Sequence, residues 1–285
     1  MQAKSFQVIG EVDDNILIQA AFAPEDVNTS LDDACRQAAA ILGVEVPAGG
    51  DIYRAVVEAS TAKNPEAVLE TVALSALALV AADASGVAFY GLPQVVSHSP
   101  LPAEGDCTML LSVKRVPIIG LSSYDSVIAA VPKVPVGSFD SQEAYELAVD
   151  QVKSAAVSEA LAKRLVAEVP AAYVAWNEDD LRNRILGLLE QQGMTLEDYL
   201  AQSGMKSSEV FDQVIGRQAA SAATEGLALD AMFRHEGLQI SEEDLVSTAS
   251  AMNGASEASA LALAGESGQL HLVREAAQRV VALRY

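Results

Sequence analysis

The residue types that usually carry catalysis or bind metal ions are few in this chain, and their spacing fits no known site. The three histidines are His98, His235 and His271. A zinc site needs His or Cys ligands at short, regular spacings, and none of these histidines stands at such a spacing from another histidine or from Cys35 or Cys107. We expect surface or hydrogen-bonded histidines, and two cysteines that behave as small buried hydrophobic residues without a disulfide.

Two other stretches could in principle bind a charged ligand. Glu178, Asp179 and Asp180 form an acidic run, but a calcium loop places its oxygen ligands at alternate positions, so we expect a solvated helix face. Residues 43–50 hold three glycines but lack the Lys-Ser/Thr pair of a phosphate-binding loop. The sequence therefore predicts no catalytic residue, no metal site and no cofactor.

The charge of the chain restricts its partners. The net charge is −21, with −9 in residues 1–135 (7 basic, 16 acidic) and −12 in residues 136–285 (11 basic, 23 acidic). Because nucleic-acid binding needs a basic face, we expect no nucleic-acid partner. The acidity indicates solubility, or alternatively a preference for basic ligands. The N-terminus lacks a signal peptide's apolar run, and residues 68–82 are too short and too alanine-rich to span a membrane, which predicts a cytoplasmic protein without a membrane partner.

The elements that would position any site differ between the two halves. Residues 1–135 read as an α+β domain with the order ββ-ααα-βββ. The helix at 65–84 is apolar on nearly all sides, which predicts that it lies centrally in a core. The expected strands are 5–12, 16–22, 95–96, 107–116 and 127–131, and the expected helices are 24–41, 51–62 and 65–84.

Residues 136–285 show the periodicity of helices only. Caps are indicated at Asp140 or Ser141 and at Thr195, and glycines end several of the helices. The helices do not recur at a fixed period, so a solenoid is not predicted. The expected helices are 141–167, 170–193, 195–203, 207–235 and, after Ser241, further helices separated near Gly254 and at 265–268.

Several phrases between Glu168 and Glu243 resemble the C-terminal substrate-binding module of trigger factors, which are ribosome-associated chaperones. They are Val169-Pro170, Gln192–Thr195, Glu197–Leu200 and Glu236–Glu243. The resemblance implies an N-terminal domain (1–135) like the family's ribosome-binding domain, and an all-α trigger factor C-terminal, SurA-like domain (136–285). The family's proline isomerase domain would follow the first domain. The linker 133–138 cannot contain it, because a domain usually needs at least about 50 residues.

The loop at 43–50 departs from the family's pattern. By resemblance it occupies the position of the ribosome-docking signature Gly-Phe-Arg-x-Gly-Lys, and the equivalent residues here are Gly43, Val44, Glu45, Pro47 and Ala48. Glu45 stands in place of the arginine and Ala48 in place of the lysine. Because docking pairs cations with phosphate-rich RNA, we predict that this chain does not dock on the ribosome in the family's way.

The resemblance implies a chaperone that holds unfolded or nascent polypeptides, here called clients, without ATP. Apolar side chains of the helical half would form the client-binding surface, with Tyr173, Trp176 and Met205 as candidates. The first alternative is an interaction or assembly protein dedicated to a single partner. The second is a peptidyl-prolyl isomerase, suggested by the family name only. A homodimer is left open.

Overall fold

The structure is a computed structural model that describes the chain except residues 46–49, 102–104, 125–130, 136–138 and 140. It divides into two compact units. The first unit is Met1–Arg115 with Val246–Val273, and the second is Val116–Leu245 with Arg274–Tyr285. This division ends the first unit before Pro135 and adds to it a segment from late in the sequence. The domain labels 1–135 and 136–285 remain predictions.

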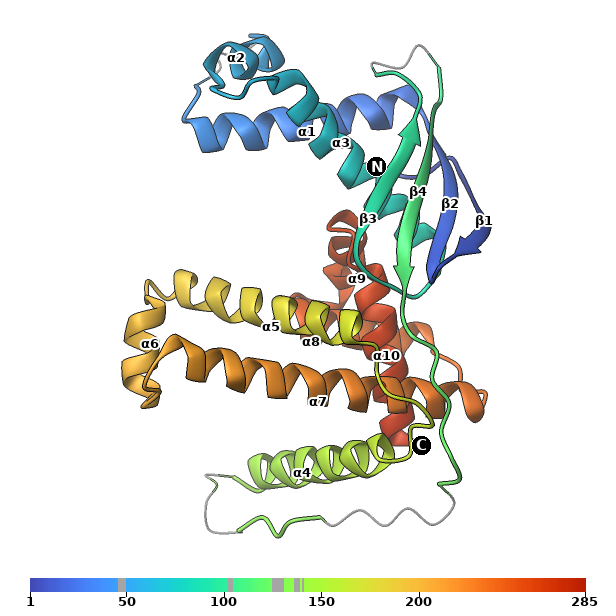
Figure 1. Cartoon of the computed structure of the whole chain (residues 1–285), viewed down its shortest axis with the longest axis vertical. Coiled ribbons are helices and arrows are strands. Elements are labelled where there is room, and N and C mark those ends of the chain that lie inside the picture. Colours follow the sequence, from blue (N-terminus) through green and yellow to red (C-terminus); the bar gives the residue numbers. More distant parts are fainter. Residues whose placement is uncertain (46–49, 102–104, 125–130, 136–138, 140) are drawn as a thin grey trace. The chain divides into compact units, whose positions relative to one another are not determined.

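The first unit contains a four-stranded antiparallel sheet with the strand order β1-β2-β4-β3 (Figure 1). The turn between the first two strands is formed by Asp13 and Asp14, whose φ angles are 48° and 64°. Positive φ at both central positions is what a tight hairpin turn requires, so the predicted hairpin is confirmed. The strands are β1 (Ser5–Val12), β2 (Asn15–Phe22), β3 (Phe89–His98) and β4 (Cys107–Arg115).

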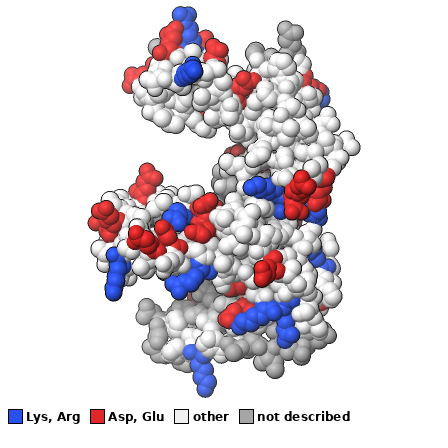
Figure 2. Space-filling model, in the orientation of Figure 1, with Lys and Arg blue, Asp and Glu red and all other residues white. Residues whose placement is uncertain are grey.

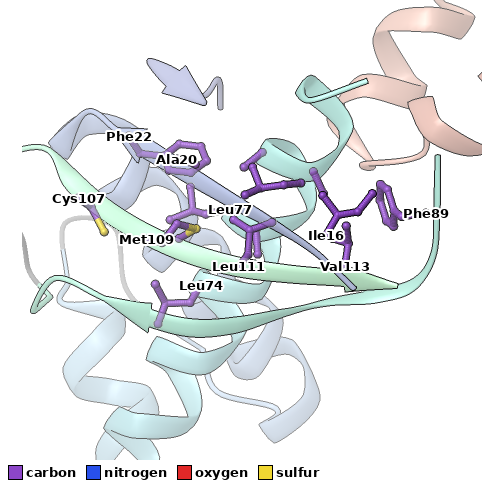
Figure 3. Packing of buried hydrophobic residues seen from close by; sticks show 14 of the residues in the cluster. Ile16, Ala20, Phe22, Leu74, Leu77, Phe89, Cys107, Met109, Leu111 and Val113 are labelled. Carbon is purple, nitrogen blue, oxygen red and sulfur yellow. The ribbon is translucent and has the colours of Figure 1, made fainter. Parts of the chain in front are cut away.

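One face of this sheet packs against helix α3 (Pro65–Ala84). Ile18 of β2, Leu111 of β4 and Leu77 of α3 are fully buried in this core, part of which Figure 3 shows. The predicted central position of the helix is thus confirmed. The helix is not buried on all sides, however, because the side chains of Val68 and Val72 are 52% and 40% exposed.

Helix α3 also corrects the expectation about membranes. It has 20 residues and a mean hydropathy of 1.8 over its most apolar window, so by length and composition it could cross a bilayer. The prediction that this run is too short was therefore wrong. Core helices of soluble proteins meet the same criterion, and in this structure the buried side of α3 contacts the sheet.

Helices α1 (Pro24–Leu42) and α2 (Ile52–Ala59) pack against α3 through a second, smaller cluster. Cys35 lies in this cluster and Cys107 in the sheet core. Both are free thiols and fully buried, as predicted. Gly43 ends α1 with a φ of 65°, a conformation that glycine adopts without strain.

The second unit consists of helices. Long helices α5 and α7 lie side by side, and the short α6 joins them at one end (Figure 1). Thr195 caps α6 through a reciprocal capping box with Asp198, which confirms the predicted cap. The elements are α4 (Gln142–Ala162), α5 (Ala171–Gln191), α6 (Leu196–Ser203), α7 (Ser208–His235), α8 (Glu242–Asn253), α9 (Glu257–Glu266) and α10 (Leu270–Arg284). Of these, α9, most of α8 (246–253) and the start of α10 (270–273) belong to the first unit.

Two predicted elements of this region differ in the structure. Helix α4 ends at Ala162 rather than at 167, because Leu165 forms a β-bridge with Leu121 and the Val166 N–H donates to the Gly120 carbonyl at 3.0 Å. The strand predicted at 127–131 falls almost wholly outside the described residues. The coarse order, a small sheet with helices followed by helices, is as predicted.

Candidate functional site

The helical unit is held together by a buried polar cluster between α7 and α10. The Arg279 guanidinium donates to both carboxylate oxygens of Asp230, at 3.1 and 2.9 Å, and also pairs with Glu275. The Tyr173 hydroxyl donates to Glu275 at 3.3 Å. Burial, and after it the nearby Glu275 carboxylate, raise the pKa of Tyr173 to about 12. Because carboxylates already pair with the cation, this cluster fixes α10 rather than performing chemistry.

A glycine makes room for this cluster. A Cβ atom added to Gly226 of α7 would lie 2.6 Å from the Arg279 Cζ atom. No side chain fits there without displacing the guanidinium, so the absence of a side chain at Gly226 permits the ion pair.

The hairpin of α5, α6 and α7 carries both buried and exposed apolar side chains. Leu189, Phe211 and Ile215 are 1–6% exposed and form the interface of the helices. Leu186, Leu188 and Val210 are 37%, 55% and 37% exposed. Exposed apolar side chains are candidates for contacts with another apolar chain.

The residues predicted to contact a client are placed differently from one another. Tyr173 is 1% exposed, so its ring belongs to the core, and this corrects the expectation that it lies on a surface. Trp176 stacks on it, with ring centroids 5.9 Å apart, and is half-buried, as is Met205. The exposed Leu188 and Val210 were not predicted, because a helical pattern alone does not tell which of two apolar stripes is covered.

A shallow groove opens where α4 leads into α5. Its wall is mostly aliphatic, with one carboxylate at Glu168, and Val166 within it is 64% exposed. It extends the apolar surface available on the second unit. The lining residues are Ala162, Leu165, Val166, Ala167, Glu168, Val169, Val174 and Thr224.

Several charged side chains on the hairpin pair with one another. Arg182 contacts Asp212 at 2.6 Å and Glu178 at 3.3 Å, and Arg184 contacts Asp180 at 3.0 Å. Figure 2 shows acidic and basic side chains interspersed on this hairpin. The run at 178–180 is thus a partly ion-paired helix face. Within the described ranges no group of three or more His, Cys, Asp or Glu side chains could hold a metal ion.

The loop that resembles the docking signature begins in an exposed position. Ile41 is 85% exposed, and Gly43 and Glu45 are exposed as well, while Val44 is half-buried. Pro47 and Ala48 lie outside the described residues. An apolar and an acidic side chain therefore face solvent on either side of Gly43.

The histidines occupy ordinary environments. His98 is exposed and its Nδ1 lies 4.0 Å from a Glu70 oxygen. His235 is exposed and contacts the Tyr124 ring edge-on. His271 is bonded to Asp83 at 2.6 Å. Each is a surface or hydrogen-bonded histidine, as expected.

Comparison with known proteins points to one family. Residues 140–278 match the family described as bacterial trigger factor protein (TF) C-terminus. A stretch of 110 residues is 33% identical to the trigger factor of Brevibacillus brevis (strain 47 / JCM 6285 / NBRC 100599). That stretch is 37% of this chain and 25% of the relative, so the match spans about a quarter of that protein's length.

A solved structure is also similar over most of its length. It is presented under the words "Promiscuous Substrate Recognition in Folding and Assembly Activities of the Trigger Factor Chaperone", and the match covers 98% of this chain and 99% of that one. The sequence identity is 10% and the TM-score is 0.35, values too low to carry an argument about the fold.

Proposed function

Because residues 140–278 match the trigger factor C-terminus and 110 residues are 33% identical to a trigger factor, we propose that this chain is a trigger factor family member and acts as a chaperone that binds unfolded or nascent polypeptides without ATP, in the cytoplasm. The observation that carries the proposal is the partial exposure of three apolar side chains, Leu186 and Leu188 of α5 and Val210 of α7, on a helical hairpin within the matched range 140–278. Such a surface suits weak, multivalent contacts with apolar segments, which a client leaves as it buries those segments itself.

The proposed client surface also includes Trp176 of α5 and Met205, which precedes α7, because both are only half-buried. Methionine is flexible and adapts to differently shaped partners. Tyr173 has no part in the surface, because its ring is buried. The N-terminal sheet unit corresponds, in this proposal, to the family's ribosome-binding domain, and the helical half to the trigger factor C-terminal, SurA-like domain.

The proposal includes no docking on the ribosome through the loop after α1. Glu45 is exposed where the family pattern has an arginine, and a carboxylate repels RNA phosphates. Cosedimentation with vacant ribosomes should show no stoichiometric, salt-resistant binding. The variant Glu45→Arg with Ala48→Lys restores the family's charges and serves as the comparison. Stoichiometric binding by the unaltered chain would contradict this part of the proposal.

The proposal also assigns no isomerase activity to this chain. In the family that activity belongs to a separate domain, and the comparison matches this chain to the C-terminal domain. Isomerisation of a proline peptide should proceed at the uncatalysed rate. A concentration-dependent acceleration by the purified chain would overturn this assignment.

The central experiment measures suppression of aggregation for several unrelated denatured proteins without nucleotide. We expect suppression by the unaltered chain and a clear loss in the variant Leu186→Ser with Leu188→Ser. The matched control is Leu92→Ser, which changes a leucine that is 82% exposed in β3. Failure with all clients, together with capture of one stoichiometric partner, would favour a dedicated interaction protein instead.

A further inference from the structure

A segment from late in the chain belongs to the first unit and contacts helix α3 there. We call the contact of Asp83 with Leu270 and His271 the joint. Asp83, near the end of α3, is 4% exposed. Its carboxylate accepts the backbone N–H groups of Leu270 at 3.1 Å and His271 at 3.0 Å, and contacts His271 Nδ1 at 2.6 Å. The first N–H groups of a helix lack partners within the helix. Asp83 therefore caps α10 from a position 187 residues away in sequence.

Packing supports the same joint. The His271 ring stacks on Phe89 of β3, with centroids 4.0 Å apart and planes at 21°. Gly268 is buried with a φ of 66°, and a Cβ atom there would lie 2.4 Å from Leu79 Cδ2. Gly268 is thus required both by its backbone conformation and by its close approach to α3.

The stretch before the joint is held by small contacts. The buried residues of α9 are Ala260 and Ala264, whereas its larger Leu263 is 45% exposed. Burial of a methyl-sized group contributes little to stability. Helix α9 has 10 residues and no side-chain cap hydrogen bond at Ser256, and isolated helices of such length are marginal in water.

We propose that residues 254–271, here called the strap, open and close as a unit over α3, with Asp83 as the lock. Left-handed glycines stand at both ends of α9, at Gly254 and Gly268. Opening would uncover Leu79. Val68, Val72 and Leu79 are spaced by four and seven residues and so share one face of α3. The exposed apolar stripe would lengthen to about 16 Å at 1.5 Å per residue. The inference stands on this geometry and does not require the proposed function.

Amide hydrogen exchange on the full chain tests the lock. In Asp83→Asn the amides of residues 257–271 should exchange about tenfold faster or more, since buried acceptor bonds to a charged group are lost. The amides of β2 and β4 should keep their protection. The matched control is Asp106→Asn, which removes an exposed carboxylate bonded to Lys4 at 2.6 Å in the same unit.

A glycine pair separates backbone strain from packing. Gly268→Ala and Gly254→Ala both place a side chain at positive φ, but the space around Gly254 is open. We expect faster exchange in the strap for Gly268→Ala than for Gly254→Ala. Binding of an apolar fluorescent dye should rise in Asp83→Asn and fall again when Leu79→Ser is added.

Three results would overturn the inference. One is unchanged strap exchange in Asp83→Asn relative to Asp106→Asn. Another is an equal acceleration in β2 and β4, which would mean that the whole unit opens. The third is faster strap exchange without any rise in dye binding, which would show that the α3 stripe does not become accessible.

Discussion

Helix α10 is fixed at its start and again in its second half by two buried polar contacts that differ in design. At its start, in the first unit, the Asp83 carboxylate accepts hydrogen bonds from two backbone N–H groups and contacts one ring nitrogen of His271. Further along, in the second unit, Arg279 is paired with two carboxylates, those of Asp230 and Glu275. The first contact caps a helix and holds small residues. The second contact joins the long helix α7 to α10. We therefore expect the Asp83 contact to hold only the strap in place, and the Arg279 contact to stabilise the whole second unit.

Breaking the Arg279 cluster should have the largest effect. Arg279→Met leaves the Asp230 carboxylate, 4% exposed, without its cation. Removing one partner of a buried ion pair costs about 3–5 kcal/mol, so the urea midpoint of the second unit should fall sharply. Arg284→Met is the control, because that side chain is 62% exposed and its pair with Asp244 lies at the surface. Equal behaviour of the two variants would contradict the supporting role.

The next largest effect should be the pH dependence of the stability that the same cluster provides. The pKa of Tyr173 is raised to about 12 in the folded chain from about 10. The unfolded chain then loses this proton first, so its contribution to stability is complete below pH 10 and is lost between pH 10 and 12. The loss should amount to about 2–3 kcal/mol at pH 12. Denaturation at pH 9 and 11.5 should show a smaller fall in Tyr173→Phe than in the unaltered chain.

The glycine that admits Arg279 gives a finer test. In Gly226→Ala the new methyl group collides with the guanidinium, which should cost about 1–3 kcal/mol of stability as overpacking does. Gly216→Ala is the matched control in the same helix, because its Cβ atom would lie 3.4 Å from the mobile end of Glu178. The control gains helix propensity without a collision. A stable Gly226→Ala would mean that the cluster tolerates displacement.

Local pattern was sufficient for many of the elements. The bounds of α3, Pro65–Ala84, follow from the Asn-Pro start and the apolar run, and Asp13 and Asp14 mark the hairpin turn. These features depend on neighbours in sequence. The early end of α4 was missed because it depends on pairing between Gly120 and Val166, which no local pattern reveals.

The membership of residues 246–273 in the first unit was missed for the same reason. The contacts of Asp83 span 187 and 188 residues. One signal was available, since Asp83 is an isolated carboxylate near the end of a helix predicted to be buried, and a buried carboxylate needs partners. The client surface was also only partly predictable. Tyr173 and Leu188 lie on the same helix, and the covered face depends on α7 and α10.

The smallest effect on global stability is expected from Asp83→Asn, which tests directly whether the Asp83 contact and the Arg279 cluster differ in role. Loss of the cap should weaken the strap by about 1–3 kcal/mol, the usual cost of an unsatisfied buried group. The Asp83 carboxylate itself is not part of the sheet core of Ile18, Leu77 and Leu111, which meets this contact at Phe89, so the urea midpoint for the sheet should change little. Far-ultraviolet circular dichroism combined with exchange in β2 and β4 measures this. A fall as large as in Arg279→Met would mean that both contacts support their whole units, and that the strap is no separate element.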